Sequence, residues 1–444
     1  MARIGFADHL FLRMHHGIGV PVFNQFVWRF ERAIPDSELK KLHFNLSQGL
    51  LSRQVIAPVL PTARRRWIAS NASLPLDLSP AVVSEDTLRC WAEQRVTDRL
   101  DPERGTGWQL AAAPSSEGGT VVSLVCSHMI ADGAAMIEAV RQANRGLPAV
   151  AAADLGARLP VISALRQDIG DTITQARPIA SWAVRTARDS TPWIGRRAPG
   201  TASSAVAPRR RVPTENTDPW RPPYVVVECP AAQWHAAATR WGGSSTSLFL
   251  GVMTALTERL GRASFGDELR WSVPVSDRRS DDLDANSTKI VHVSVAVPEP
   301  EDRDLTRIRK ATKTALTELA DRESGASVPL ELVQMLPDRL VAKLPTPPDG
   351  AEGLCSNLGR LPHDFRTFGG IAADSISARA IFDGAEKAFA RSLGGGSTAW
   401  ACESADTVTI TVHGMDPDRV GTDDELSGTL AEVLRRWGLT YRFW

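Results

Sequence analysis

The sequence predicts an α/β (α+β) protein with two lobes of similar size. The chain has 444 residues, and at about 100–200 residues per domain this length suggests two domains. Patterns typical of strands and of helices alternate in both halves, which indicates mixed layers. Residues 196–223 are rich in proline and arginine, a composition unsuited to either element. We therefore expect an N-terminal lobe at 1–195, a linker or exposed loop at 196–223, and a C-terminal lobe at 224–444.

In the first half, two strands and three helices support this prediction. Residues 20–30 are rich in β-branched and aromatic side chains, and 120–126 form a short apolar run, so both segments are predicted strands. Apolar residues recur every three to four positions after Asp36, which predicts an amphipathic helix. Further helices are expected at 133–144 and 162–187.

The second half alternates in the same way. Residues 289–297 place four valines on one face and form the clearest strand of the chain. Residues 398–402 and 407–413 are predicted to pair as a hairpin. The remaining predicted elements are helices at 245–261, 303–319 and 423–437 and a strand at 268–276.

Composition disfavours several classes of protein. Lys and Arg number 51 and Asp and Glu also number 51, so nothing in the net charge indicates a nucleic-acid binder. The five cysteines are scattered without a C-x-x-C pair, which favours reduced thiols over a disulfide framework or a zinc site. The N-terminus lacks the apolar core of a signal peptide, and no stretch of about 18 apolar residues predicts a membrane span. We expect a cytoplasmic protein, and a monomer, because two lobes could enclose a site without a partner.

One motif combines chemically active residues. A predicted strand ends just before the pattern H-x-x-x-D-G, whose defined residues are His128, Asp132 and Gly133, and a predicted helix follows. Such turns present side chains at the end of a sheet, and a neutral imidazole can take a proton from a hydroxyl or amine at pH 7. Asp132 either fixes the tautomer of His128, as in a catalytic triad, or turns away and anchors the loop through an arginine. The alternative without catalysis is a buried histidine beside an aspartate that caps the helix.

This motif resembles the active-site motif of the CoA-dependent acyltransferase superfamily. That superfamily includes chloramphenicol acetyltransferase, nonribosomal peptide condensation domains, wax ester synthases and polyketide-associated acyltransferases. Three further segments resemble its patterns in the same order: V-P-V-S-D-R at 273–278, A-N at 285–286, and L-C-S-N-L-G at 354–359. The order of elements matches over nearly the whole chain, and least in the linker region.

The resemblance implies a fold of two chloramphenicol-acetyltransferase-like lobes with a central channel between them. His128 would be the general base. Asp132 would point away from the substrate and pair with an arginine, for which Arg278 is the candidate. Ser356 and Asn357 would lie beside the channel as candidate oxyanion or substrate contacts.

The chain also departs from the superfamily's patterns. Many condensation domains and wax ester synthases carry H-H-x-x-x-D-G, whereas Ser127 stands at the first of these positions here. This difference disfavours those two branches and makes Ser127 a further candidate for a substrate contact. The D-F-G-W-G motif of the plant branch is absent, although Asp364 and Phe365 follow the 354–359 segment.

The implied function is acyl transfer to the hydroxyl or amine of a small acceptor, in secondary or lipid metabolism. The donor would be a thioester on CoA or on the phosphopantetheine of a carrier protein. Because the thioester is a co-substrate, no tightly bound cofactor and no metal are expected. One alternative is a free-standing condensation enzyme that forms an amide from a carrier-bound donor. Another is a non-catalytic condensation-like scaffold, which the intact H-x-x-x-D-G motif disfavours.

Other notable residues have plainer interpretations. Arg209–Arg211 could meet the phosphates of a donor, but a solvated linker is the favoured interpretation. Trp182 and Trp193 flank a helical segment that could contact a membrane surface, although packing between the lobes is favoured. His292 is expected to be a satisfied sheet histidine, and His413 to end a strand at a turn.

Overall fold

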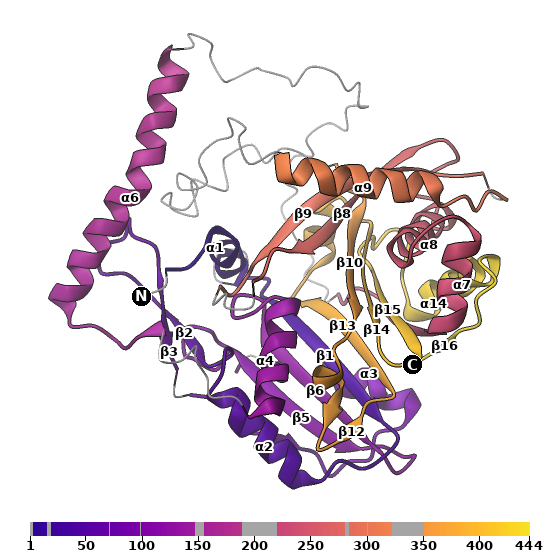
Figure 1. Ribbon diagram of the computed structural model, residues 1–444, viewed down its shortest axis with the longest axis horizontal. Coiled ribbons are helices and arrows are strands. Elements are labelled where there is room, and N and C mark those ends of the chain that lie inside the picture. The colour runs from indigo at the N-terminus through magenta and orange to yellow at the C-terminus, as the bar shows by residue number, and fades with distance from the viewer. Residues whose placement is uncertain are drawn as a thin grey trace.

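Two large β-sheets organise the structure, one in each lobe (Figure 1). The computed structural model describes residues 3–15, 19–70, 72–97, 99–146, 155–188, 220–279, 284–299, 301–321 and 350–444. Most of the predicted linker at 196–223 lies outside the described residues, and so do Trp193 and Arg209–Arg211. The two lobes are therefore described without most of the chain that links them.

The sheet of the N-terminal lobe has five strands. Their order is β13 (Ser375–Phe382), β1 (Val22–Phe30), β6 (Thr120–Ser127), β5 (Trp108–Pro114) and β4 (Asp77–Leu78). Helices α2 (Asp36–Ser47) and α4 (Gly133–Arg145) cover one face, and α3 (Glu85–Glu93) packs on the other. Because both faces are covered, β1 and β6 are buried along almost their whole length, which explains why most of their side chains are apolar.

The sheet of the C-terminal lobe has seven strands. Their order is β16 (Arg442–Phe443), β7 (Tyr224–Pro230), β15 (Thr407–Gly414), β14 (Ser397–Glu403), β10 (Gly353–Arg360), β8 (Glu268–Ser276) and β9 (Thr288–Ala296). One apolar core joins this sheet to α7 (Ala231–Arg240), α8 (Ser245–Arg259), α9 (Thr306–Asp321) and α14 (Asp423–Arg436). The valines at 291, 293, 295 and 297 all point into this core, as their alternation predicted.

The chain crosses between the lobes after β10. It passes through α12 (His363–Arg366) and the hairpin of β11 (Thr367–Phe368) and β12 (Ile371–Ala372), and returns as β13. Strand β13 pairs antiparallel with β1, and Figure 1 shows this orange strand within the indigo and purple sheet. The predicted lobes, 1–195 and 224–444, do not account for this strand, which belongs to the second segment in sequence but to the first sheet in space. A strand from the second segment completes the first sheet because the edge of β1 is open to ladder hydrogen bonds.

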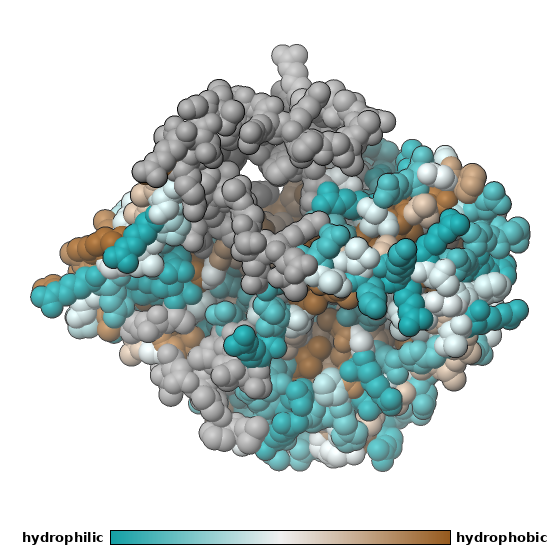
Figure 2. Space-filling view, turned by 45° about the horizontal axis from the view of Figure 1, so that its top comes forward, coloured by the Kyte–Doolittle hydropathy of each residue, from teal (hydrophilic) through white to brown (hydrophobic). Residues whose placement is uncertain are grey.

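The long helix α6 (Val161–Arg188) extends away from the rest of the molecule (Figure 1). Its inner side is held by ion pairs from Arg3 to Asp168 and from Arg64 to Asp171. Hydrophobic side chains are visible in Figure 2 at this projection and in the depression near the middle of the face. No helix in the described ranges is both long and apolar enough to cross a membrane.

Most predicted elements are present with bounds within a few residues of those expected. The predicted hairpin is β14 paired antiparallel with β15. His292 lies in β9 with its Nδ1 3.4 Å from the Ser272 hydroxyl. His413 lies one residue before the end of β15, as expected, but the turn position is wrong, because the residue is paired between Tyr224 and Thr398 and is only 4% exposed.

Candidate functional site

The H-x-x-x-D-G motif lies where β6 ends, at the boundary between the lobes. Ser127 is the last residue of β6, and the backbone N–H of His128 donates to the carbonyl of Val22 at 2.9 Å. Successive side chains of a strand point to opposite faces. Ser127 is directly opposite Phe23 on β1 and is buried with it, whereas His128 is half-buried and lines a cavity.

Asn286 determines which nitrogen of His128 carries the proton. The amide Nδ2 of Asn286 donates to the backbone carbonyl of His128 at 2.9 Å and to Asp8 Oδ1 at 2.8 Å. Both partners are acceptors, so the amide oxygen must face His128 Nδ1, which lies 3.0 Å away. Nδ1 therefore carries the hydrogen, and the lone pair is on Nε2. Nε2 has no hydrogen-bond partner among the described residues and is free to act as a base.

An aromatic ring covers one face of the His128 imidazole. Phe11, from the N-terminal helix α1 (Phe6–Arg13), stacks on it with ring centroids 3.8 Å apart and an interplanar angle of 17°. Burial lowers the pKa of His128 below its ordinary value, because the charged imidazolium loses solvation. Hydrogen bonds to backbone and to Asn286, and the charge of Asp132, oppose this shift of the pKa only in part. His128 is therefore neutral at pH 7, the form that can accept a proton.

Asp132 caps helix α4 and binds the opposite lobe. Its Oδ1 accepts from the Ala135 N–H at 2.8 Å and from Arg278 Nη2 at 3.3 Å. Its Oδ2 accepts from the Ser287 N–H at 2.8 Å and from the Thr288 hydroxyl at 2.9 Å. The carboxylate is thus fully occupied and makes no hydrogen bond to the imidazole. The triad-like alternative is not what the structure shows, and the arginine pair is present.

Arg278 and residues 284–288 of the C-terminal lobe form one cross-lobe clamp with the motif of the N-terminal lobe. Besides the side-chain contacts of Asp132 and Asn286, the N–H of Asp132 donates to the carbonyl of Ala285 at 2.9 Å. Arg278 Nη2 also donates to the carbonyls of Asp284 and Ala285 at 2.9 and 3.3 Å. The position of the imidazole therefore depends on contact between the two lobes.

A cavity of about 390 Å³ opens onto His128; we call it the His128 cavity. Its wall comes from both lobes, with residues of α1, β1, α4 and β13 on one side and of β8, β9, β10 and β14 on the other. Apolar side chains such as Phe26, Ile137 and Phe382 form much of this wall. An apolar cavity with a few polar groups is the usual setting of a binding or active site.

Strand β10 brings Ser356 and Asn357 to the His128 cavity in different ways. The amide of Asn357 donates to the Thr246 hydroxyl at 3.0 Å, and its oxygen accepts from the Gly359 N–H at 2.9 Å. Asn357 is thus engaged with the start of α8. Within the described residues, the Ser356 hydroxyl has no hydrogen-bond partner, so of these two side chains Ser356 is the better placed to donate to a ligand.

Ser127 and Gly133 differ in their relation to the cavity. Ser127 is 2% exposed and is not part of the wall, so the structure does not support the substrate contact expected for it. Its strand register directs it to the opposite face from His128. Gly133 is in the wall, and a Cβ atom there would lie 3.3 Å from Leu358 Cδ2, which explains the preference for a small residue.

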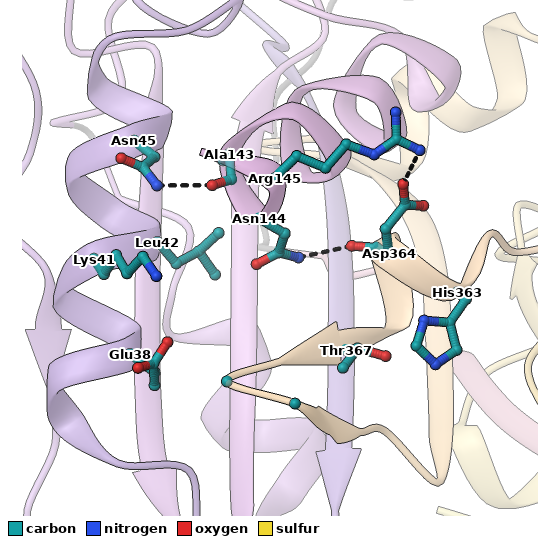
Figure 3. A pocket seen from close by; sticks show the side chains of 12 residues that line it. Glu38, Lys41, Leu42, Asn45, Ala143, Asn144, Arg145, His363, Asp364 and Thr367 are labelled. Carbon is teal, nitrogen blue, oxygen red and sulfur yellow. Dashed lines mark hydrogen bonds and ion pairs between the residues drawn. The ribbon is translucent and has the colours of Figure 1, made fainter. Parts of the chain in front are cut away.

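A second hollow of about 390 Å³ lies between α2, α4 and the β11–β12 hairpin (Figure 3). Several of its charged and polar groups bind one another. Asp364 pairs with Arg145, the Asn144 amide donates to the carbonyl of Asp364 at 2.7 Å, and the Asn45 amide donates to the carbonyl of Ala143 at 2.7 Å. These contacts fasten the crossing segment to the helices, and no residue of the H-x-x-x-D-G motif reaches this hollow.

Sequence reasoning missed two residues of the site and the role of a third. Asp8 and Phe11 come from α1, whose sequence carries no motif. In the sequence, Asn286 is only part of the A-N segment that resembles the superfamily's pattern, and nothing there indicates that it holds the imidazole of His128. Asp8 and Asn286 are 278 positions apart, so only the folded chain reveals their hydrogen bond.

Asp132→Asn is expected to lower the free energy of unfolding by about 3–5 kcal/mol, because it leaves the buried Arg278 without its charged partner. The two side chains are only 4% and 8% exposed. Denaturant unfolding measures the change. The matched control Asp418→Asn removes a pair whose side chains are 45% and 58% exposed and should cost about 1 kcal/mol or less. Equal stability of Asp132→Asn and the unmodified protein would contradict a structural role.

Phe11→Ala is expected to raise the pKa of His128 towards its ordinary value, because water can then solvate the imidazolium. Titration of the His128 ring protons by NMR measures this pKa. Phe44→Ala is the control, since Phe44 is 62% exposed and lies on α2 away from the cavity. An unchanged or lower pKa in Phe11→Ala would show that stacking is not a source of the shift.

Comparison with known proteins identifies the fold. No protein-family model matches the chain, and no curated protein matches it in sequence. The first condensation domain of the CDA synthetase is similar with a TM-score of 0.59 and 13% identity, over 98% of this chain and 95% of that one. The wax ester synthase/diacylglycerol acyltransferase from Marinobacter aquaeolei VT8 has a TM-score of 0.53 and 15% identity, over 99% and 100%. Polyketide synthase associated protein 5 from Mycobacterium tuberculosis has a TM-score of 0.52 and 14% identity, over 97% and 96%.

These similarities extend over whole chains, although few residues are identical. At such low identity they establish the architecture, while the reaction must be argued from the site itself. The chain has the fold of the condensation-domain and CoA-dependent acyltransferase superfamily, in which two chloramphenicol-acetyltransferase-like lobes face each other.

Proposed function

We propose that this protein transfers an acyl group from a thioester to the hydroxyl or amine of a second molecule, with His128 as the general base. One observation carries the proposal. His128 presents a free Nε2 at the interlobe cavity, while Asn286 holds its Nδ1 in the protonated state. A histidine that only stabilised the fold would not need an unpaired, basic nitrogen at a cavity.

The proposed reaction is a single acyl transfer. Nε2 of His128 takes the proton of the acceptor O–H or N–H as that oxygen or nitrogen attacks the thioester carbonyl. A carbon–oxygen or carbon–nitrogen bond forms, and the tetrahedral intermediate collapses with cleavage of the carbon–sulfur bond. The imidazolium then returns its proton to the departing thiolate. The products are an ester or amide and a free thiol, and holding both reactants in one cavity supplies much of the rate gain.

The negative charge on the intermediate needs a fixed donor. We assign this role to the Ser356 hydroxyl, which lines the His128 cavity without a partner among the described residues. Asn357 is the weaker candidate because its amide group already binds Thr246 and Gly359.

The donor is a thioester on CoA or on the phosphopantetheine of a carrier protein, and donor and acceptor meet in a passage between the lobes. The fold is shared with a condensation domain and with a wax ester synthase, so amide formation from a carrier-bound donor is the second candidate function. Parallel assays with one acyl chain on CoA and on a carrier protein, analysed by mass spectrometry of the products, separate these two donors. A non-catalytic scaffold is disfavoured, because recruitment does not require the contacts that hold the His128 tautomer.

His128→Ala is expected to lower kcat by roughly 10²–10⁴-fold, the usual contribution of a general base. Product formation from a panel of acyl thioesters and acceptors measures the loss, and circular dichroism checks the fold. His235→Ala, which alters a half-exposed histidine paired with Glu403, is the matched control and should keep full activity. A folded His128→Ala protein with unchanged turnover would refute the proposed role of His128.

Ser356→Ala is expected to lower kcat by about 10²–10³-fold with little change in KM, because the hydroxyl would bind the oxyanion more strongly than the substrate carbonyl. Steady-state kinetics measure both constants. Ser392→Ala removes an exposed hydroxyl on α13 (Lys387–Ser392) and serves as the control. A changed KM with unchanged kcat would instead indicate a contact made equally in the ground state.

A further inference from the structure

Arg379 is a buried cation without a carboxylate partner in the described part of the chain. It lies on β13, is 7% exposed, and its Nε donates to Gln25 Oε1 at 2.7 Å. Its Nη2 is buried and has no hydrogen-bond partner among the residues that the structure describes. A buried guanidinium in this state is unfavourable unless something else supplies the missing acceptor.

Arg379 lines a cavity of about 590 Å³ that is separate from the His128 cavity; we call it the Arg379 cavity. Its guanidinium carbon lies 4.2 Å from the centroid of the Tyr224 ring, which fixes the side chain by a cation–π contact. Arg221 is also in the wall, but its charge is balanced by ion pairs with Glu93 and Asp423. Of these two arginines, Arg379 is the one with its charge unbalanced.

His413 adds a second unsatisfied group to the Arg379 cavity. It is 4% exposed, and its Nε2 is buried without a hydrogen-bond partner in the described ranges. Burial, reinforced by the charges of Arg379 and Arg221, lowers the pKa of His413 well below its ordinary value. A neutral imidazole can donate one hydrogen bond, so it can complement an anion bound beside Arg379.

The Arg379 cavity adjoins the His128 cavity along the interface between the lobes. Both cavities include Arg379 and Phe382 in their walls. Side chains alternate along β13, so Ala378 and Ala380 face the His128 cavity while Ile381 faces the Arg379 cavity. The two cavities therefore meet at the side chains of Arg379 and Phe382, and a molecule bound at Arg379 lies beside the His128 cavity.

We propose that the Arg379 cavity binds the carboxylate of the acyl acceptor, a small hydroxy or amino acid with an apolar body. Arg379 would hold the carboxylate with its two terminal nitrogens, and His413 would add a third hydrogen bond. The apolar body would contact Trp220, Ile381 and Phe382 in the same wall. The term acceptor rests on the proposed acyl transfer, whereas the carboxylate site rests only on the geometry of Arg379 and His413.

The surrounding charges favour a single carboxylate over the phosphates of a donor. Asp383 and Glu386 also line the cavity, in addition to Glu93, which is paired with Arg221, so a group with several negative charges would be repelled more strongly than a single carboxylate. One carboxylate would be balanced by the one unbalanced guanidinium. The phosphates of CoA or phosphopantetheine are the competing source of an anion, so binding of phosphopantetheine is measured alongside binding of the acids.

The test measures binding by calorimetry to a panel of hydroxy and amino acids of graded side-chain size, each paired with its primary amide. At least one acid should bind the unmodified protein roughly tenfold or more tightly than its amide. Arg379→Gln should abolish this preference for the acid. Arg379→Lys keeps the positive charge but loses the paired N–H donors of the guanidinium, so it should retain only part of the preference. Arg360→Gln changes a side chain that is 69% exposed and should leave binding unchanged.

Three results would overturn the proposal. The first is that no acid in the panel binds better than its amide. The second is that the folded Arg379→Gln protein keeps the preference for the acid. The third is that binding of phosphopantetheine depends on Arg379 more strongly than binding of the acid does. Thermal melting accompanies each variant, because removing a buried unpaired charge should not destabilise the protein.

Acyl transfer is assayed separately with the acid that binds best. Binding that depends on Arg379, without any transfer that depends on His128, would leave the carboxylate site standing and refute the proposed function. The opposite result is acyl transfer to a neutral acceptor at a rate that Arg379→Gln does not change, with no binding of any acid. That result would support the proposed function and refute the carboxylate site.

Discussion

The site depends on one constraint, the cross-lobe clamp that joins the H-x-x-x-D-G motif to Arg278 and residues 284–288. Asp132 receives four hydrogen bonds, three of them from the opposite lobe, and Asn286 holds His128 through both its ring and its backbone carbonyl. These groups are largely withdrawn from water, so separating the lobes would strand a carboxylate and a guanidinium. The same contacts that join the lobes thus orient the imidazole.

The exchange of β13 reinforces this arrangement. A strand from the second half of the chain pairs with β1, so neither lobe's sheet is built from one continuous segment. Its alternating side chains contribute to both the His128 cavity and the Arg379 cavity. Strand β13 is the edge strand of its sheet and forms ladder hydrogen bonds with β1 along one edge. Its other edge is therefore available to line cavities between the lobes.

The similarity to condensation domains and to a wax ester synthase shows how much sequence change this architecture tolerates. Identities of 13% and 15% accompany coverage of nearly whole chains. A fold of this kind requires apolar strands and covered sheet faces, conditions that many sequences meet. The fold does not dictate which residues line the cavities. In this chain the cavity walls include Arg379, whose charge has no carboxylate partner in the described residues.

Local patterns were sufficient to predict several of the helices and strands and the motif, but not elements such as α1, β5, β7 or β13. The valines of β9 alternate, and the apolar run of β6 ends in His128, so periodicity and residue type indicated both before any contact was known. Ser127 was misjudged, since register against β1 directs it away from the cavity. His413 was misjudged because burial on the face of a sheet is not visible in a strand's own residues.

The sequence by itself determined that two mixed lobes carry a histidine with acid–base potential after a buried strand. Only the tertiary structure decided that Asn286 and Asp8 select the tautomer of His128, that Asp132 turns to Arg278, and that Ser356 faces the cavity. The reason is physical: the first two outcomes are hydrogen bonds between segments more than 100 residues apart, and the third depends on where strand β10 meets the opposite lobe, so all three exist only once the chain has folded.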